Sequence, residues 1–99
     1  MLTFEIQIIN KLGIHARASS KLVELANQFT SKIVIDKEGR TANAKSIMSV
    51  MMLSANFGST INITIDGIDE TLAMTKISEL INNKFYEEIN ILLKNNNNI

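Results

Sequence analysis

Hydrophobic and polar residues alternate in two stretches of the chain, as they do in β-strands with one buried face. In residues 2–9, the apolar side chains Leu2, Phe4, Ile6 and Ile8 alternate with Thr3, Glu5 and Gln7. Residues 61–66 repeat the pattern more clearly, with Ile61, Ile63 and Ile65 separated by polar side chains. Residues 32–36 and 40–44 are predicted as two shorter strands, joined by a hairpin turn at Lys37, Glu38 and Gly39.

Three other stretches have the spacing of amphipathic helices. Residues 16–29 place Leu22, Val23, Leu25, Ala26 and Phe29 on one side. Ser46 precedes a short apolar run and is predicted to cap a second helix, which we expect to end before Gly58. A third helix is predicted from about Asp69, and its buried face comprises Ala73, Ile77, Leu80, Ile81 and Phe85.

The predicted order is strand, helix, strand, strand, helix, strand, helix. The length of 99 residues fits one domain with one core. Strands interleaved with helices on so short a chain indicate a two-layer α+β domain, with helices on one face of a single sheet. The half-polar strands favour an antiparallel sheet whose other face is open.

Composition narrows the possible functions. Ten basic and ten acidic residues give no net charge, which argues against non-specific nucleic-acid binding and gives no reason to expect a membrane surface as partner. The chain has no cysteine, so disulfides and thiolate metal sites are excluded. No apolar stretch approaches the ~20 residues of a membrane span, and no signal peptide is recognisable, so we expect a cytoplasmic protein.

The segment Gly13-Ile14-His15-Ala16-Arg17 is the best candidate for chemistry. His15 is the only histidine, and it falls where the first loop meets the first helix. Unpaired N–H groups and the helix dipole make such a start an anion site, and Arg17 adds a forked cationic donor. The same field disfavours the imidazolium, so we expect a neutral ring with a nitrogen free to attack phosphorus. Gly13 would let the loop backbone come close to the ring.

The motif alone also fits an ordinary polar residue at a helix start, followed by a solvated arginine. Its context is more specific: Lys45-Ser46-Ile47-Met48, Val50-Met51 and Leu53 follow, and Asp66-Gly67 precedes the last helix. Together these segments resemble the HPr family, the histidine phosphocarriers of the bacterial phosphoenolpyruvate-dependent phosphotransferase system. The resemblance covers about residues 1–88, which we take as the domain.

The resemblance implies an open-faced sandwich of four antiparallel strands and three helices. It implies that His15 accepts a phosphoryl group on Nδ1 from enzyme I and donates it to an enzyme IIA protein, while Arg17 stabilises the group. Such a protein is a carrier rather than an enzyme, and it needs no cofactor or metal. Neither the sugar-transport branch nor the nitrogen-regulatory branch of the system is singled out by the sequence.

The resemblance also gives roles to the second predicted helix. Ser46 matches a serine that an ATP-dependent HPr kinase phosphorylates in many members, although a plain helix cap explains it equally well. Methionine suits surfaces that must fit several partners, so Ile47, Met48 and Met51 are predicted to dock partner proteins. Met52 is predicted to lie in the core.

The chain departs from the family in two places. Many members have proline directly after the active-site arginine, whereas this chain has Ala18, a good helix former that should preserve the turn. Residues 89–99 extend past the family's usual end, and we expect a fraying helix or disorder there. A carrier that must present His15 to two partners in turn is expected to work as a monomer.

Other classes of function have less support. A regulatory adaptor acting only through Ser46 is an alternative, but the presence of both His15 and Arg17 argues against it. For an enzyme we find no carboxylate pair, no metal-ligand cluster, no nucleophile–base arrangement and no glycine-rich nucleotide loop. An RNA-binding sheet would need aromatic or basic residues, and Phe4 is the only aromatic residue in a predicted strand.

Overall fold

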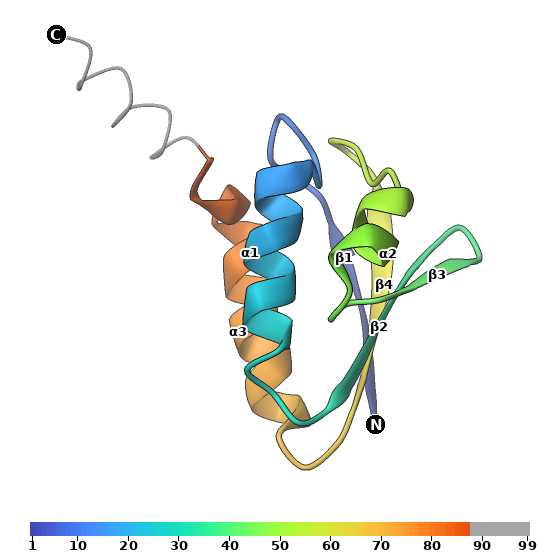
Figure 1. Cartoon of the computed structure of the whole chain (residues 1–99), viewed down its shortest axis with the longest axis vertical. Coiled ribbons are helices and arrows are strands. Elements are labelled where there is room, and N and C mark those ends of the chain that lie inside the picture. Colours follow the sequence, from blue (N-terminus) through green and yellow to red (C-terminus); the bar gives the residue numbers. More distant parts are fainter. Residues whose placement is uncertain (88–99) are drawn as a thin grey trace, which may run out of the picture.

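A computed structural model describes residues 1–87 of the chain. The elements follow the predicted order, with a short 3₁₀ turn added at the end (Figure 1). They are β1 (Leu2–Gln7), α1 (Ala16–Ala26), β2 (Lys32–Lys37), β3 (Arg40–Asn43), α2 (Ile47–Met52), β4 (Thr60–Asp66), α3 (Glu70–Asn82) and η1 (Lys84–Tyr86). No helix within this part of the chain is long and apolar enough to cross a membrane.

The four strands form one sheet in the order β1-β4-β2-β3, and every neighbouring pair is antiparallel. In the central strand β4, Ile63 lies opposite Phe4 on one side and Ile35 on the other. Ile61, Ile63 and Ile65 are fully buried while Asn62 is exposed, so only one face of the sheet packs against the helices. The predicted α+β open-faced sandwich, with four antiparallel strands and three helices, is confirmed.

The core is built from the stripes that the sequence periodicity indicated. In α1, Ala18, Leu22 and Ala26 recur every fourth residue and are fully buried. In α3 the buried side chains are Ala73, Ile77, Leu80 and Ile81. Both helices contribute to the same buried cluster as the sheet isoleucines Ile61, Ile63 and Ile65. Truncating one of these isoleucines to alanine should cost about 2–5 kcal/mol of stability.

Two helices end earlier than predicted. The first ends at Ala26 because Asn27 turns its amide back to the carbonyl of Val23, at 2.9 Å, and to that of Lys45, at 3.3 Å. Phe29 is still buried, but it lies in the loop that follows. The second ends at Met52, and the chain turns through Ser54 at φ 51°, well before Gly58.

The prediction that Phe85 lies on the buried face of the last helix was wrong. Helix α3 stops at Asn82, and Lys84, Phe85 and Tyr86 follow with φ of 57°, 54° and 55°. These left-handed conformations are unfavourable for non-glycine residues, by roughly 1–2 kcal/mol each. The turn still buries the Phe85 ring, so hydrophobic burial offsets part of this cost. The expectation for residues 89–99 concerns a segment outside the described residues.

The prediction that Met52 lies in the core was also wrong, because Met52 is 66% exposed. Val50 and Leu53, which are three positions apart, fill the core beneath α2 instead. Met52 comes two residues after Val50, about 200° round the helix, and therefore faces solvent.

Candidate functional site

The loop between β1 and α1 is held in place by the loop that follows α2. The backbone of Ile8 exchanges hydrogen bonds of 2.8 Å with Ser59 and Gly58, and Ile14 N donates to Ala55 O at 2.8 Å. Gly13 has φ +66°, and a Cβ there would lie 2.8 Å from Ala55 O. Gly13 therefore permits contact between the two loops, whereas the sequence suggested an approach to the His15 ring.

His15 is the N-cap residue of α1. Its backbone is extended, with φ −82° and ψ −176°, and its carbonyl accepts the hydrogen bond from Ser19 N at 2.8 Å. The ring nitrogen Nδ1 accepts a hydrogen bond from Arg17 N at 3.3 Å, in the place of the side-chain oxygen that usually caps a helix. Nδ1 therefore presents a lone pair to the positive end of the helix. The helix forms with Ala18 in place of proline, as expected.

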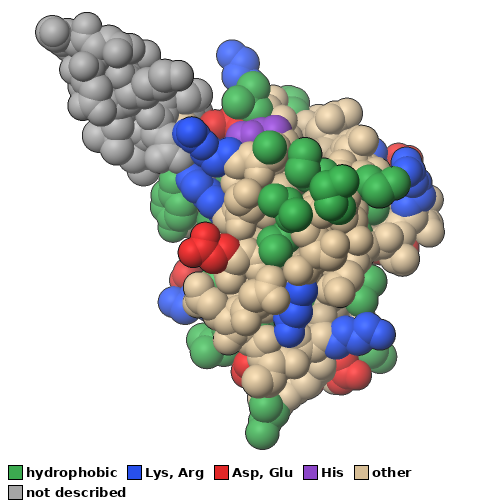
Figure 2. All heavy atoms as spheres, in the orientation of Figure 1, with side chains coloured by type: hydrophobic (Ala, Val, Ile, Leu, Met, Phe, Trp, Pro, Cys, Tyr) green, Lys and Arg blue, Asp and Glu red, His purple; other side chains and the backbone are tan. Residues whose placement is uncertain are grey.

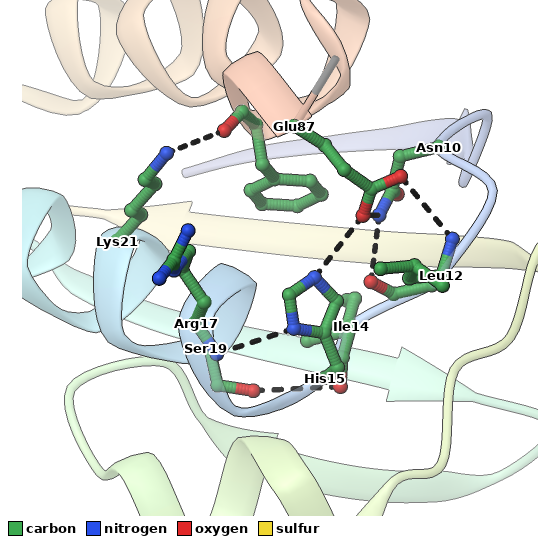
Figure 3. Close-up of polar contacts among 10 residues, drawn as sticks. Asn10, Leu12, Ile14, His15, Arg17, Ser19, Lys21 and Glu87 are labelled. Atoms are coloured by element: carbon green, nitrogen blue, oxygen red, sulfur yellow. Dashed lines mark hydrogen bonds and ion pairs between the residues drawn. The ribbon is translucent and has the colours of Figure 1, made fainter. Parts of the chain in front are cut away.

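The other ring nitrogen contacts Glu87, a residue that the sequence reasoning missed. His15 Nε2 lies 3.1 Å from Glu87 Oε1, and the Glu87 side chain is only 7% exposed (Figure 3). The same carboxylate accepts hydrogen bonds from Asn10 Nδ2 at 3.2 Å and from Leu12 N at 3.3 Å. His15 and Glu87 are 72 positions apart, so no local sequence motif indicates that they are in contact.

Glu87 is a carboxylate ion at neutral pH. Burial raises the pKa of its carboxyl group, but the hydrogen bonds from Asn10, Leu12 and His15 outweigh this, so its pKa lies below the usual value. The carboxylate lies on the opposite side of the ring from the start of α1. The prediction of a neutral ring rested on the helix alone. In the structure the His15 ring lies between the N-terminus of α1 and the Glu87 carboxylate.

Arg17 lies beside the histidine and is available to a ligand. Its side chain is exposed, and its guanidinium makes no hydrogen bond or ion pair with another described residue. It borders a hollow of about 350 Å³ whose other lining residues are Leu12, His15, Ala16, Ala18, Phe85 and Glu87. The structure thus brings the two predicted site residues, His15 and Arg17, together on one open surface.

Ser46 caps α2, as predicted. Its side-chain oxygen accepts a hydrogen bond from Ser49 N at 3.4 Å, and the residue is half-buried. The three residues predicted to dock partners, Ile47, Met48 and Met51, are exposed. Figure 2 shows hydrophobic side chains gathered over α2, beside the histidine. We call the exposed side chains Ile47, Met48, Met51 and Met52 the α2 patch.

Residues 1–87 contain no group of three histidine, aspartate or glutamate side chains placed to hold a metal ion. The groups gathered at the site are the His15 imidazole, the Arg17 guanidinium, the Glu87 carboxylate and the backbone N–H groups at the start of α1. A nucleophilic ring nitrogen beside an anion-binding helix start is suited to carrying a phosphoryl group.

Comparison with known proteins agrees with this chemistry. The family described as "PTS HPr component phosphorylation site" matches residues 2–83. The chain belongs to the HPr family of phosphocarrier proteins. The phosphocarrier protein HPr of Cupriavidus necator is 52% identical over 87 residues, which cover 88% of this chain and 98% of that protein. Members of this family are phosphocarriers of the phosphotransferase system and not catalytic enzymes.

Solved structures show the same fold. The crystal structure of HPr-C-His from Thermoanaerobacter tengcongensis has a TM-score of 0.83 and 38% identity, covering 86% of this chain and 96% of that one. A second crystal structure from that organism is described as an HPr dimer, and it matches with a TM-score of 0.69 and 38% identity, covering 86% of this chain and 98% of that one. Dimers therefore exist among HPr structures, and family membership does not imply a monomer.

Proposed function

We propose that His15 carries the phosphoryl group, bound to Nδ1, after receiving it from enzyme I, and passes it to an enzyme IIA protein. The observation that carries this proposal is that the two ring nitrogens of His15 face different hydrogen-bonding partners. Nδ1 is a hydrogen-bond acceptor at the start of α1, whereas Nε2 faces the carboxylate of Glu87. Only Nδ1 combines a lone pair with an approach along which an anion is favoured.

The transfer step is a substitution at phosphorus. The lone pair of Nδ1 forms the new N–P bond while the bond between phosphorus and the donor breaks, and the donor keeps that electron pair. The hydrogen bond of 3.3 Å from Arg17 N to Nδ1 is long, so it is readily exchanged for one to a phosphoryl oxygen. Phosphate charge then lies against the helix N-terminus.

Arg17 stabilises the phosphoryl group in this proposal. Its guanidinium is exposed and borders the same hollow as the His15 ring. A guanidinium is permanently charged and can donate two parallel hydrogen bonds to phosphate oxygens. We expect Arg17→Ala to slow phosphoryl transfer while leaving the amount of phosphoryl group bound at completion unchanged.

The test is phosphorylation with enzyme I and phosphoenolpyruvate, followed by intact mass and acid stability. The wild type should gain one acid-labile phosphoryl group, because histidine-linked phosphate is lost in acid. His15→Asn should gain none, and asparagine is a good N-cap, so this variant should keep the start of α1. Uptake that persists in His15→Asn would contradict the proposal, as would a failure of folded wild type to be phosphorylated by an active enzyme I.

The α2 patch is proposed as the docking surface for enzyme I and the enzyme IIA protein. Ile47, Met48 and Met51 are exposed on a helix that lies next to α1, where the phosphoryl group is held (Figure 2). Flexible methionine side chains can adapt to two different partners. The core beneath does not depend on them, since Val50 and Leu53 fill it.

Ser46 is proposed as a regulatory phosphorylation site for an HPr kinase. The residue is half-buried and immediately precedes Ile47 in the α2 patch. A phosphate there would add about two negative charges at the edge of an apolar docking surface and would oppose docking. Ser46→Asp should therefore weaken binding of enzyme I, while Ser46→Asn, which keeps the cap without the charge, should not.

We also propose that the carrier works as a monomer in the cytoplasm. His15 and the α2 patch share one face, and a second copy covering that face would block both partners (Figure 2). Analytical ultracentrifugation at several protein concentrations measures the oligomeric state, and the mass of a monomer is the expected result. A stable dimer that still accepts phosphate from enzyme I would contradict it.

A further inference from the structure

The chain beyond α3 reaches back over the site through an unusual turn. Between the end of α3 and Glu87, the residues Lys84, Phe85 and Tyr86 adopt three consecutive left-handed conformations. The turn is fastened by the buried Phe85 ring and by Lys21 of α1, whose Nζ donates to Phe85 O at 2.7 Å (Figure 3). Glu87 follows directly and lies on the β1–α1 loop. Unfavourable backbone conformations that persist next to a reactive group are a sign of a functional constraint.

Glu87 joins three parts of the β1–α1 loop with one carboxylate. Oε1 accepts from Asn10 Nδ2 at 3.2 Å and contacts His15 Nε2 at 3.1 Å, while Oε2 accepts from Leu12 N at 3.3 Å. Asn10 is fully buried and also donates to Gly13 O at 2.7 Å. The carboxylate is thus held from several sides, in an orientation that faces Nε2.

The hydrogen-bond pattern determines which ring nitrogen bears the proton. A carboxylate can only accept hydrogen bonds, so the proton between Oε1 and Nε2 belongs to Nε2. Arg17 N–H can only donate, so Nδ1 must be the acceptor. Both contacts select the same tautomer, with hydrogen on Nε2 and the lone pair on Nδ1.

We propose that Glu87 is a positioning residue that keeps the proton on Nε2 of His15 in both the free and the phosphorylated carrier. The proposal rests on the proposed function of His15. It extends to a residue outside the segment, 2–83, over which the family match runs. Its role is analogous to that of a carboxylate that orients a catalytic or metal-binding histidine.

The chemical need for this proton appears when the phosphoryl group leaves. When Nδ1 forms the N–P bond and Nε2 keeps its hydrogen, the ring becomes a phosphorylated imidazolium, and its positive charge lies against the Glu87 carboxylate. When the acceptor attacks phosphorus, the electron pair of the N–P bond returns to Nδ1 and a neutral imidazole leaves. A ring that had lost the Nε2 proton would have to leave as imidazolate, which is a far poorer leaving group.

Few other charged side chains lie close enough to the His15 ring to affect its Nε2 proton. Apart from His15, the only charged side chains that line the hollow are those of Arg17 from α1 and Glu87 from beyond α3. Helix α2 has no charged residue. Lys21 is directed at the carbonyl of Phe85. Within the described residues, Glu87 is the anion that contacts the ring.

The experiment compares wild type with Glu87→Ala, Glu87→Gln and the control Glu79→Gln. The control removes an exposed carboxylate on α3 that pairs with Lys76 at 3.9 Å. Long-range ¹H–¹⁵N NMR spectra of the His15 ring report the tautomer. Transfer from the phosphorylated carrier to the enzyme IIA protein is measured as a function of pH. Glu87→Gln keeps the shape and an acceptor oxygen but loses the charge, whereas Glu87→Ala loses both.

We expect Glu87→Ala to mix the two tautomers and Glu87→Gln to keep the wild-type tautomer. In both variants the anion that favours the Nε2 proton is lost, so the transfer rate should begin to fall at a pH about one unit lower than in wild type. At alkaline pH the rate should then be about tenfold below that of wild type. Glu79→Gln should match the wild type. A uniform loss of rate at every pH with an unchanged tautomer would show that Glu87 only stabilises the loop, and would overturn the proposal.

The result is separable from the proposed function. If wild type accepts no phosphoryl group from enzyme I, the proposed function fails. The ring spectrum of the unphosphorylated protein still decides whether Glu87 fixes the proton. If Glu87→Ala leaves both the tautomer and the pH profile unchanged while the wild type is phosphorylated normally, only the inference about Glu87 fails.

Discussion

The ammonium group of Lys21 donates a hydrogen bond of 2.7 Å to the carbonyl oxygen of Phe85. This contact joins α1, whose N-cap is His15, to the left-handed turn that precedes Glu87, which contacts the same histidine. Lys21 therefore links α1 to the turn before Glu87, in addition to the direct contact between His15 and Glu87. The link can be removed without changing either His15 or Glu87.

Replacing Lys21 with methionine keeps the apolar stem and removes the donor. We expect Lys21→Met to lower the free energy of unfolding by about 1–2 kcal/mol, as for the loss of a charged hydrogen bond. Urea denaturation measures the change. Lys76→Met is the control, because Lys76 makes an exposed ion pair with Glu79 at 3.9 Å, and its replacement should cost less than about 1 kcal/mol. Equal losses in the two variants would argue against the link.

Gly13 should be far less tolerant of a side chain than Gly39. Both have positive φ, +66° and +86°, so alanine meets the same backbone penalty of roughly 1–2 kcal/mol at each. At Gly13 a Cβ would also lie 2.8 Å from Ala55 O, whereas at Gly39 it would meet nothing within 4 Å. Gly13→Ala should therefore be less stable than Gly39→Ala by about 1–3 kcal/mol in urea denaturation. Similar stabilities would mean that the two loops separate easily.

Asp69 should make the protein sensitive to acid. Its carboxylate accepts from the Ser31 hydroxyl and from Thr30 N and Ser31 N at 2.9 Å and 3.0 Å. The Ser31 hydroxyl foremost, then the Thr30 N–H, lowers the pKa of Asp69 from 3.8 to about 2. A lowered folded pKa gives stability that is present above the unfolded pKa and is lost as the pH falls towards the folded value.

The expected loss for Asp69 lies between about pH 5 and about pH 2. Asp69→Asn should be less stable than wild type at neutral pH, and its stability should fall less over that range. Thermal unfolding at a series of pH values measures both effects. Glu24→Gln removes an exposed acidic side chain on α1 and should retain the wild-type slope. A wild-type slope in Asp69→Asn would assign the acid sensitivity to other groups.

Met48 should contribute to partner binding and not to stability. It is 67% exposed in the α2 patch, so Met48→Ala should weaken the affinity for enzyme I by about 1–2 kcal/mol, as a docking side chain does. Its melting temperature should match that of wild type. Leu72→Ala, at an exposed leucine of α3 outside the patch, should bind normally. Calorimetric titration compares them, and equal affinities for all three proteins would remove Met48 from the docking surface.

Most of the fold could be predicted because it depends on short-range periodicity. The alternation of apolar and polar residues around Ile63 indicates a strand with one buried face. The separation of four residues between Leu22 and Ala26 likewise indicates a helix with one buried face. Helix ends were less predictable, since they depend on single contacts such as the Asn27 amide folding back on Val23. Met52 was misplaced because a helix of six residues is too short for its apolar residues to define a buried side.

The geometry of the candidate site was predictable only where the motif is local. His15 and Arg17 lie two positions apart at a helix start, and the structure brings them together as expected. Glu87 was not predictable, because its contact with His15 depends on the left-handed turn at Phe85. Nothing in the periodicity of the last helix indicates that a left-handed turn follows it.

Locating the phosphoryl group on the His15 ring tests the proposed carrier role most directly. Protein labelled with ¹⁵N at histidine would be phosphorylated by enzyme I and phosphoenolpyruvate, and the coupling between phosphorus and each ring nitrogen would be measured by NMR. Coupling to Nδ1, with hydrogen still on Nε2, is the predicted result. Coupling to Nε2, or the absence of any phosphohistidine, would show that Nδ1 of His15 does not carry the phosphoryl group.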